Sequence, residues 1–237
     1  THSNGECSGT QVDITAQFNQ PVTTSFNAYT FDTECWIWGG LTNSEWSTAA
    51  NWYKYDGSKW LRQSSSTPGA SDKVYLMSYA NAGSLCVSNS NHAIIPAAAV
   101  TDLIVGSGAE VDLNGSFSLA GDLTNNGTIN YGTSSVSMTG GSDQTISGSA
   151  TTLNNLTVNK TGGSLIVITP ITVMGTLDMS AGNIINSSIV ILGSSSANPG
   201  ILSHTTGIIT GEFRRYFPNA TGSQLFPIGT ASVMRDV

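Results

Sequence analysis

The sequence has few charged residues, and its positive charges are not clustered. Only 10% of its 237 residues are Asp, Glu, Lys or Arg, against roughly 25% in a typical soluble domain. Eight Lys and Arg stand against fifteen Asp and Glu, which gives a net charge of −7. Phosphate backbones and anionic membrane surfaces are both bound by grouped cations. We therefore expect no nucleic-acid partner and no electrostatic attachment to a membrane.

Long apolar runs are also absent. The runs that occur, such as residues 189–192, are the size of a strand, far short of the roughly 18 residues of a membrane-spanning helix. No membrane insertion is expected. The chain begins with Thr1 rather than Met, and we interpret it as a mature secreted protein whose signal peptide has been removed.

Cysteine is scarce, with three residues in the whole chain. Cys7, Cys35 and Cys86 permit one disulfide in three alternative pairings and leave one thiol over. None lies in a CxxC pair, and none has a His at metal-ligand spacing. We expect one disulfide that fixes the N-terminal region, no metal site and no cofactor.

Polar, uncharged residues take the place of charge, since Ser, Thr and Asn make up about a third of the chain. All five Trp lie between Trp36 and Trp60, among turns marked by Gly39-Gly40 and Pro68-Gly69. Residues 1–99 are therefore predicted to form an irregular, tryptophan-rich head or cap that leads into the next region.

Residues 100–210 contain short apolar–polar alternations that end at Gly, Asn, Ser or Pro. Residues 103–105, 111–113 and 117–119 are the first examples. This period of two predicts strands throughout, with no helical period. The strands also recur at long range. Phe117, Leu119 and Gly121 match Ile171, Val173 and Gly175 at a spacing of about 54 residues, and other segments match at nearly the same spacing.

Such a repeat indicates stacked units that share one core. The predicted fold is all-β: a right-handed parallel β-helix, or solenoid, with an N-terminal aromatic-rich β cap. Residues 100–210 hold two copies of a unit of about 54 residues, each interpreted as two or more coils. Residues 211–237 are predicted to start a further C-terminal β segment, in a piece of a longer polypeptide.

Several segments in combination resemble large secreted β-helix repeat proteins of Bacteroidota. The segments are residues 46–52 (WSTAANW), 68–74 (PGASDKV), 94–96 (IIP), 123–130 (LTNNGTIN), 144–148 (QTISG), 153–158 (LNNLTV), 175–179 (GTLDM), 211–217 (GEFRRYF) and 225–230 (LFPIGT). The resemblance implies export by the type IX route and an extracellular or cell-surface location. It implies no catalytic residues.

The residues themselves offer weak support for catalysis. The three His are scattered and no GxSxG elbow occurs, so a nucleophilic triad is not expected. Polysaccharide lyases and hydrolases do use parallel β-helices, but they need clustered acids. Asp112 and Asp178 align with Ile166 and Thr124 between the two copies. The acids are thus predicted to be isolated and solvated, with no ladder.

The aromatic head is the best candidate for a contact surface. We expect most of its Trp rings to form the core of the cap, with Trp36 and Trp38 on one strand face. Residues 53–60 (YKYDGSKW) read as an exposed hairpin. Tyr53, Tyr55, Lys59 and Trp60 are therefore the candidate ligand-contact residues, because exposed aromatic rings stack on sugars.

These features favour a non-enzymatic structural or adhesive module of a surface protein or filament. Its expected partners are further copies of itself or neighbouring domains of the same polypeptide, through β-stacking or strand exchange at an open end of the solenoid. Surface glycans are possible partners of the head. The alternatives are a carbohydrate-binding module and, less favoured, a polysaccharide lyase or hydrolase. Ice binding is disfavoured, because no Thr-x-Thr occurs between Thr101 and Thr210.

Overall fold

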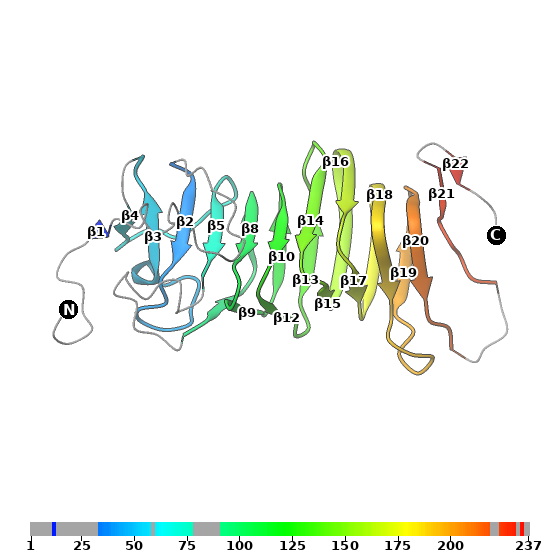
Figure 1. Cartoon of the computed structure of the whole chain (residues 1–237), viewed down its shortest axis with the longest axis horizontal. Helices are drawn as coiled ribbons and strands as arrows, with labels where there is room; N and C mark the ends of the chain where they lie inside the picture. The colour runs from blue at the N-terminus through cyan, green and yellow to red at the C-terminus, as the bar shows by residue number, and fades with distance from the viewer. Residues whose placement is uncertain are drawn as a thin grey trace.

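The computed structural model describes residues 33–57, 60–77, 91–218 and 223–230, and the backbone of strands at 11–12 and 233–234. In this part of the chain, regular structure is almost entirely β, with one short 3-10 helix, η1 (Ala49–Asn51), and no α-helix. None of its helices has the length and apolarity to cross a membrane. The strands stack into an elongated body with the cap at one end (Figure 1).

The body has three sides, which the chain visits in the same order in every coil. Side 1 is built of parallel strands. They are β7 (Ala98–Val100), β10 (Ser116–Leu119), β13 (Ser135–Met138), the first part of β16 (Asn155–Val167), the first part of β18 (Thr176–Leu192) and β19 (Ile201–His204).

Side 2 continues from the cap into the coils, again with parallel pairing. Its strands are β2 (Cys35–Trp38), β5 (Lys73–Leu76), β8 (Asp102–Val105), β11 (Leu123–Asn125), β14 (Gln144–Gly148), the second part of β16, the middle of β18 and the start of β20 (Ile209–Arg215).

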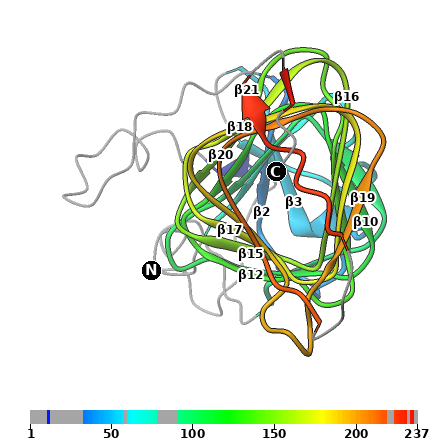
Figure 2. The same cartoon turned by 90° about the vertical axis from the view of Figure 1, so that its right-hand side faces the viewer.

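Side 3 closes each coil. Its strands are β6 (Ala93–Ile95), β9 (Glu110–Leu113), β12 (Thr128–Asn130), β15 (Thr151–Leu153), β17 (Ile171–Val173), the end of β18 and the end of β20. Viewed along the long axis, the three sides enclose a common interior (Figure 2). The predicted all-β parallel β-helix is confirmed.

The register of paired strands gives the number of residues in each coil. On side 1, Phe117 pairs with Val136, whereas Leu177 pairs with Leu202, a longer step along the chain. The coils therefore differ in length. In the described part of the chain, the strands of side 1 mark six coils, from β7 at Ala98 to the end of β20 at Arg215. They lie close to the predicted span of residues 100–210.

The long-range sequence repeat, which we call the echo, has a geometric explanation in this β-helix. Phe117 on side 1 and Ile171 on side 3 are separated by two coils and two further sides. The echo thus relates strands on different sides, which all need inward apolar residues at alternate positions. The echo also matches Val136 and Met138 with Ile189 and Ile191 of β18. This match fails, because Ile189 and Ile191 are only half-buried while their neighbours Val190 and Leu192 are buried.

One apolar core runs the length of the solenoid. Inward residues of the three sides and four Trp of the cap belong to the same cluster, which extends from Trp36 to Ile209. Each coil adds one layer, and each layer is covered by its neighbours. Such a core gains its stability from stacking rather than from any single unit.

The acids at the corner between sides 1 and 2 form a ladder that the sequence interpretation missed. Asp102 accepts the backbone N–H of Asp122 at 2.7 Å, and Asp122 accepts that of Thr145 at 2.7 Å. Asp143 does the same for Ser164 at 2.7 Å, and Asn183 for Ile208 at 2.9 Å. The expectation of isolated, solvated acids is therefore wrong here, because each side chain satisfies an N–H of the following coil.

The cap departs from the parallel pattern. Strands β3 (Trp52–Tyr55) and β4 (Trp60–Arg62) form an antiparallel hairpin on the outer edge of β2, and β1 (Gln11–Val12) adds to β4. This hairpin extends side 2 beyond the coils and occupies the backbone groups that an edge strand would expose.

The other end of the body is built differently. The N–H of Ile209 donates to the carbonyl of Pro227 at 2.7 Å, and Ile209 forms a parallel bridge with Ile228. The short strands β21 (Gly229–Thr230) and β22 (Val233–Met234) pair antiparallel. Side 2 is therefore continued by one more backbone segment, while β19 ends side 1 in the described part of the chain.

Candidate functional site

The five Trp of the head are packed inside the cap. Trp52 is fully buried and meets the rings of Trp36, Trp38 and Trp46 edge-on, at centroid distances of 6.3, 4.9 and 4.6 Å. Its indole N–H donates to the carbonyl of Trp46 at 2.7 Å. The expectation that these rings form the core of the cap is confirmed, and Trp36 and Trp38 share the inner face of β2.

The predicted contact hairpin is only partly exposed. Trp60 is fully buried and Tyr53 is 5% exposed, so neither ring offers a free face to a ligand. Burial raises the pKa of Tyr53 above its usual value, although the charge of Arg62 acts in the opposite direction. Lys59 lies outside the described residues. Of the four predicted contact residues, Tyr55 alone is half-exposed among those described, and its ring lies tilted against that of Trp60 at a centroid distance of 5.2 Å.

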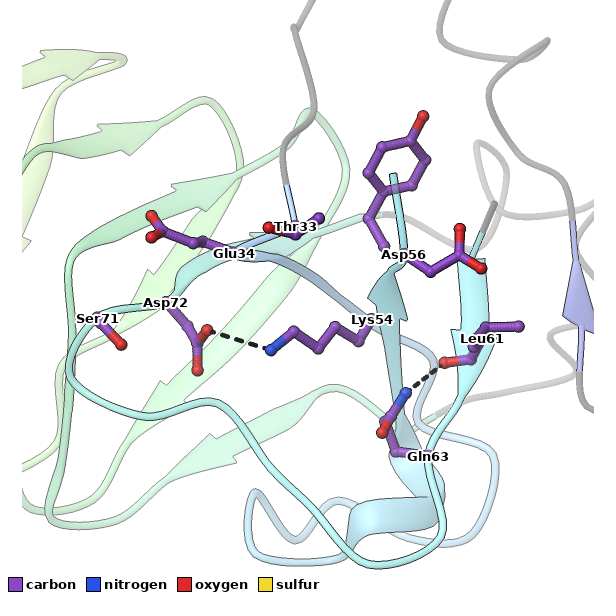
Figure 3. Close-up of a pocket in the computed structure, with 9 residues that line it drawn as sticks. Thr33, Glu34, Lys54, Asp56, Leu61, Gln63, Ser71 and Asp72 are labelled. Carbon is purple, nitrogen blue, oxygen red and sulfur yellow. Dashed lines mark hydrogen bonds and ion pairs between the residues drawn. The ribbon is translucent and has the colours of Figure 1, made fainter. Parts of the chain in front are cut away.

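A cavity of about 450 Å³ opens between the β3–β4 hairpin and the turns that precede β2 and β5; we call it the head cavity. Figure 3 shows Lys54 pointing toward Asp72, with Gln63 below it and Glu34 above Asp72. The lining of the cavity combines backbone and side chains of the turn before β2, of the hairpin and of the turn before β5. The lining residues are Thr33, Glu34, Lys54, Tyr55, Asp56, Leu61, Gln63, Ser71 and Asp72.

The polar groups of the head cavity also hold the fold together. Asp72 accepts the N–H of Gly69 at 2.7 Å through one oxygen and faces Lys54 at 3.8 Å through the other. The ammonium of Lys54 also lies 5.0 Å from the ring centroid of Trp36. Gln63 donates to the carbonyl of Leu61 at 2.8 Å. The site therefore offers carboxylates and one cation, polar groups that can bind the hydroxyls of a ligand.

A second polar cluster lies on the outer face of side 3. Glu110 and Asp112 project outward from β9, and His92 directly precedes β6. The Nε2 atom of His92 lies 2.8 Å from Asp112. Asn130 on β12 donates through one nitrogen to Asp112 at 2.7 Å and to Glu110 at 2.8 Å. We call these residues the side 3 cluster.

The electrostatics of the side 3 cluster favour an ionised carboxylate. Partial burial raises the pKa of Asp112, but the hydrogen bonds from Asn130 and His92 and the charge of His92 outweigh it, so the net pKa lies below the usual value. The sequence interpretation missed this cluster. The available signal was the coil spacing, since His92, Asp112 and Asn130 follow one another at intervals close to the length of one coil.

One lysine of the coils is buried at a corner of the solenoid. Lys160 is 5% exposed and donates to the carbonyl of Gly140 at 3.2 Å and to Gln144 at 2.7 Å. Burial lowers its pKa, while the charges of Asp143 and Asp122 act in the opposite direction. These contacts make Lys160 part of the corner between sides 1 and 2.

One of the three cysteines proposed for the disulfide lies among the described residues. Cys35 is buried at the start of β2, whereas Cys7 and Cys86 lie outside the described residues. The pairing therefore stays a prediction.

Comparison with known proteins found no matching family model, no matching curated protein and no matching solved structure.

Proposed function

We propose that this chain is a non-enzymatic structural module of an extracellular or cell-surface protein, which uses its solenoid as a stiff spacer. The observation that carries the proposal is the single apolar core that joins the Trp cap to the last coil. Because each coil is held by its neighbours on three sides, bending requires many strand pairs to distort together. A stiff body holds its two ends at a fixed separation.

Adhesion or assembly is proposed at the ends. Within the described residues, β19 pairs on one edge only, with β18, and Ile201 on this strand is 64% exposed. An exposed strand edge is a template for β-addition. The resemblance to secreted repeat proteins of Bacteroidota supports a surface location reached through the type IX route.

The location is tested by immunolabelling the source cells with antibodies raised against the purified chain. We expect intact cells to label as strongly as permeabilised cells. Labelling that needs permeabilisation would overturn the surface assignment.

Electron microscopy of the purified chain at high concentration tests assembly. We expect end-to-end rods, and dispersed monomers would count against assembly.

A second candidate function is carbohydrate binding in the head cavity. It is favoured by the carboxylates and the Lys54 cation that line this cavity, whose lining also includes the half-exposed Tyr55, because sugars combine hydroxyl hydrogen bonds with ring stacking. A glycan array tests it. We expect a hit to disappear in Tyr55→Ala and to persist in Tyr131→Ala, which changes a half-buried Tyr outside the cap. Equal binding by both variants would remove the head cavity from consideration.

A further inference from the structure

We propose that His92, Glu110 and Asp112 form a binding site for a transition-metal dication, with Zn²⁺ as the reference ion. One ligand atom from each residue can be chosen so that all three lie within 4.8 Å of one another. The set offers one imidazole nitrogen and two carboxylate oxygens. Imidazole suits zinc, copper and nickel, whereas calcium and magnesium take oxygen ligands.

The backbone places the three ligands before any metal arrives. Ala93 pairs with Val111 in parallel register, so His92 and Glu110 lie opposite each other on neighbouring coils. Asp112 follows Glu110 at the next outward position of β9. Ligands fixed on a rigid sheet lose little conformational entropy on binding. The site is thus built from two coils, and the imidazole distinguishes it from a chance group of surface acids.

Partial burial of His92 and Asp112 favours coordination over simple hydration at these two residues, whereas Glu110 is exposed. The side chains of His92 and Asp112 are each 35% exposed. Three protein ligands with one water form a common zinc geometry, in which ligand atoms stand about 3.4 Å apart for bonds of about 2.0–2.2 Å. The Nε2 atom of His92 and the nearer oxygen of Asp112 must therefore separate slightly from 2.8 Å, and Glu110 must swing inward.

Asn130 is expected to behave differently in the metal-free and the metal-bound cluster. Its amide nitrogen lies between the two carboxylates and bonds to both. A dication would take over this role, so the amide has to turn away when the metal binds. In the metal-bound cluster Nε2 of His92 carries no proton and the ring proton resides on Nδ1, because only the unprotonated nitrogen coordinates. Removal of the Asn130 amide should therefore not weaken zinc binding.

The experiment is a titration of the full chain with ZnCl₂. Calorimetry measures the zinc affinity, and NMR of the imidazole nitrogens identifies the ligand. We expect one site at which Nε2 of His92 shifts on zinc addition. His92→Ala should weaken binding at least about tenfold, because even outer-shell substitutions cost roughly 10–100-fold in metal affinity. Asp112→Asn should do the same, and Asn130→Ala should bind zinc as well as or better than the native chain.

His204→Ala is the matched control. Nε2 of His204 lies 2.8 Å from the carbonyl of Gly207 at the other end of the body, and this variant should bind zinc like the native chain. The urea midpoint of each variant separates loss of a ligand from loss of the fold. No binding by the native chain, unchanged binding by His92→Ala, or zinc held without a shift of the His92 signals would each overturn the proposal.

Discussion

The cap and the coils bury their strands in different ways. In the coils, buried and half-exposed residues alternate, as in β13 (Ser135–Met138) and β17 (Ile171–Val173), so that one face of each strand meets the core. In the cap, all four residues of β2 are buried. A second cluster of Cys35, Ile37, Tyr53, Trp60 and Tyr75 covers the outer face.

The difference follows from what each region has to cover. A coil has neighbours above and below, so its strand edges are paired and only one face needs an apolar layer. The end of the solenoid exposes a strand edge and a cross-section of the core together. Here the β3–β4 hairpin covers the edge of β2, and Trp46 lies over the interior with its ring 6.0 Å from that of Phe117. Large rings close the end with few residues.

The largest expected effect comes from breaking the cap at Trp52. Trp52→Ala removes a fully buried ring that contacts three other Trp. We expect a loss of about 3–5 kcal/mol in the free energy of unfolding, from lost burial and the cavity left behind. Urea unfolding monitored by circular dichroism measures it. A loss below about 1 kcal/mol would show that the cap is not needed to close the core.

The next effect tests the corner of the coils at Gln144. This buried side chain accepts the N–H of Gly140 at 2.8 Å and a proton of Lys160, and it donates to the carbonyls of Leu119 and Gly121. Gln144→Leu leaves the N–H of Gly140 without this acceptor and removes one partner each from Lys160 and the two carbonyls. The carbonyl of Leu119 keeps the N–H of Thr139 at 2.9 Å. We expect a loss of about 3 kcal/mol, since each orphaned polar group costs about 1–3 kcal/mol.

Thr145→Val, on the neighbouring outward position, is the control for Gln144→Leu and should change stability by less than about 0.5 kcal/mol. Hydrogen exchange should place the loss in the coils around β14 rather than in the cap. Equal stability of Gln144→Leu and the native chain would show that apolar packing alone holds the coils.

A smaller effect is expected from the corner ladder. Asp122→Ala removes the acceptor for the N–H of Thr145 at 2.7 Å, and the site is exposed enough for water to replace it in part. By analogy with helix N-caps, we expect a loss of about 1 kcal/mol. Asp122→Asn keeps an oxygen acceptor and should recover most of it. An Asn variant as unstable as the Ala variant would indicate that charge, not the hydrogen bond, matters.

The smallest effect is expected at the exposed ion pair of β20. Arg214 lies 3.3 Å from Glu212, with side chains 56% and 63% exposed. Pairs of this kind contribute about 0–1 kcal/mol and weaken further with salt. Arg214→Ala should shift the urea midpoint barely beyond error. A clear shift that disappears at high salt would show that charge stabilises this end of the solenoid, in contrast to the coils.

The alternation of apolar and polar residues along the chain was enough to predict the strands. The alternation at residues 117–119 and 171–173 requires one buried face whatever the coil geometry. It was also enough to place Trp36 and Trp38 on a common face. The length of one coil was not accessible in this way. The long-range echo matches inward residues on different sides, because all three sides demand the same pattern.

The chemical sites depended on the coil length. His92, Asp112 and Asn130 are far apart in sequence and meet because successive coils place them side by side. The corner ladder of Asp102, Asp122 and Asp143 is hidden for the same reason. The sequence pattern offered Trp60 as a contact residue, but the β3–β4 hairpin turns its ring into the cap.

By itself the sequence determined the class of the fold: short strands of period two, scarce charge and a cluster of Trp specify a stacked β structure with an aromatic end. Only the tertiary structure decided which outward side chains become neighbours. Period-two burial depends on nearest neighbours along the chain, whereas contacts between coils depend on the number of residues in every intervening turn, which varies from coil to coil.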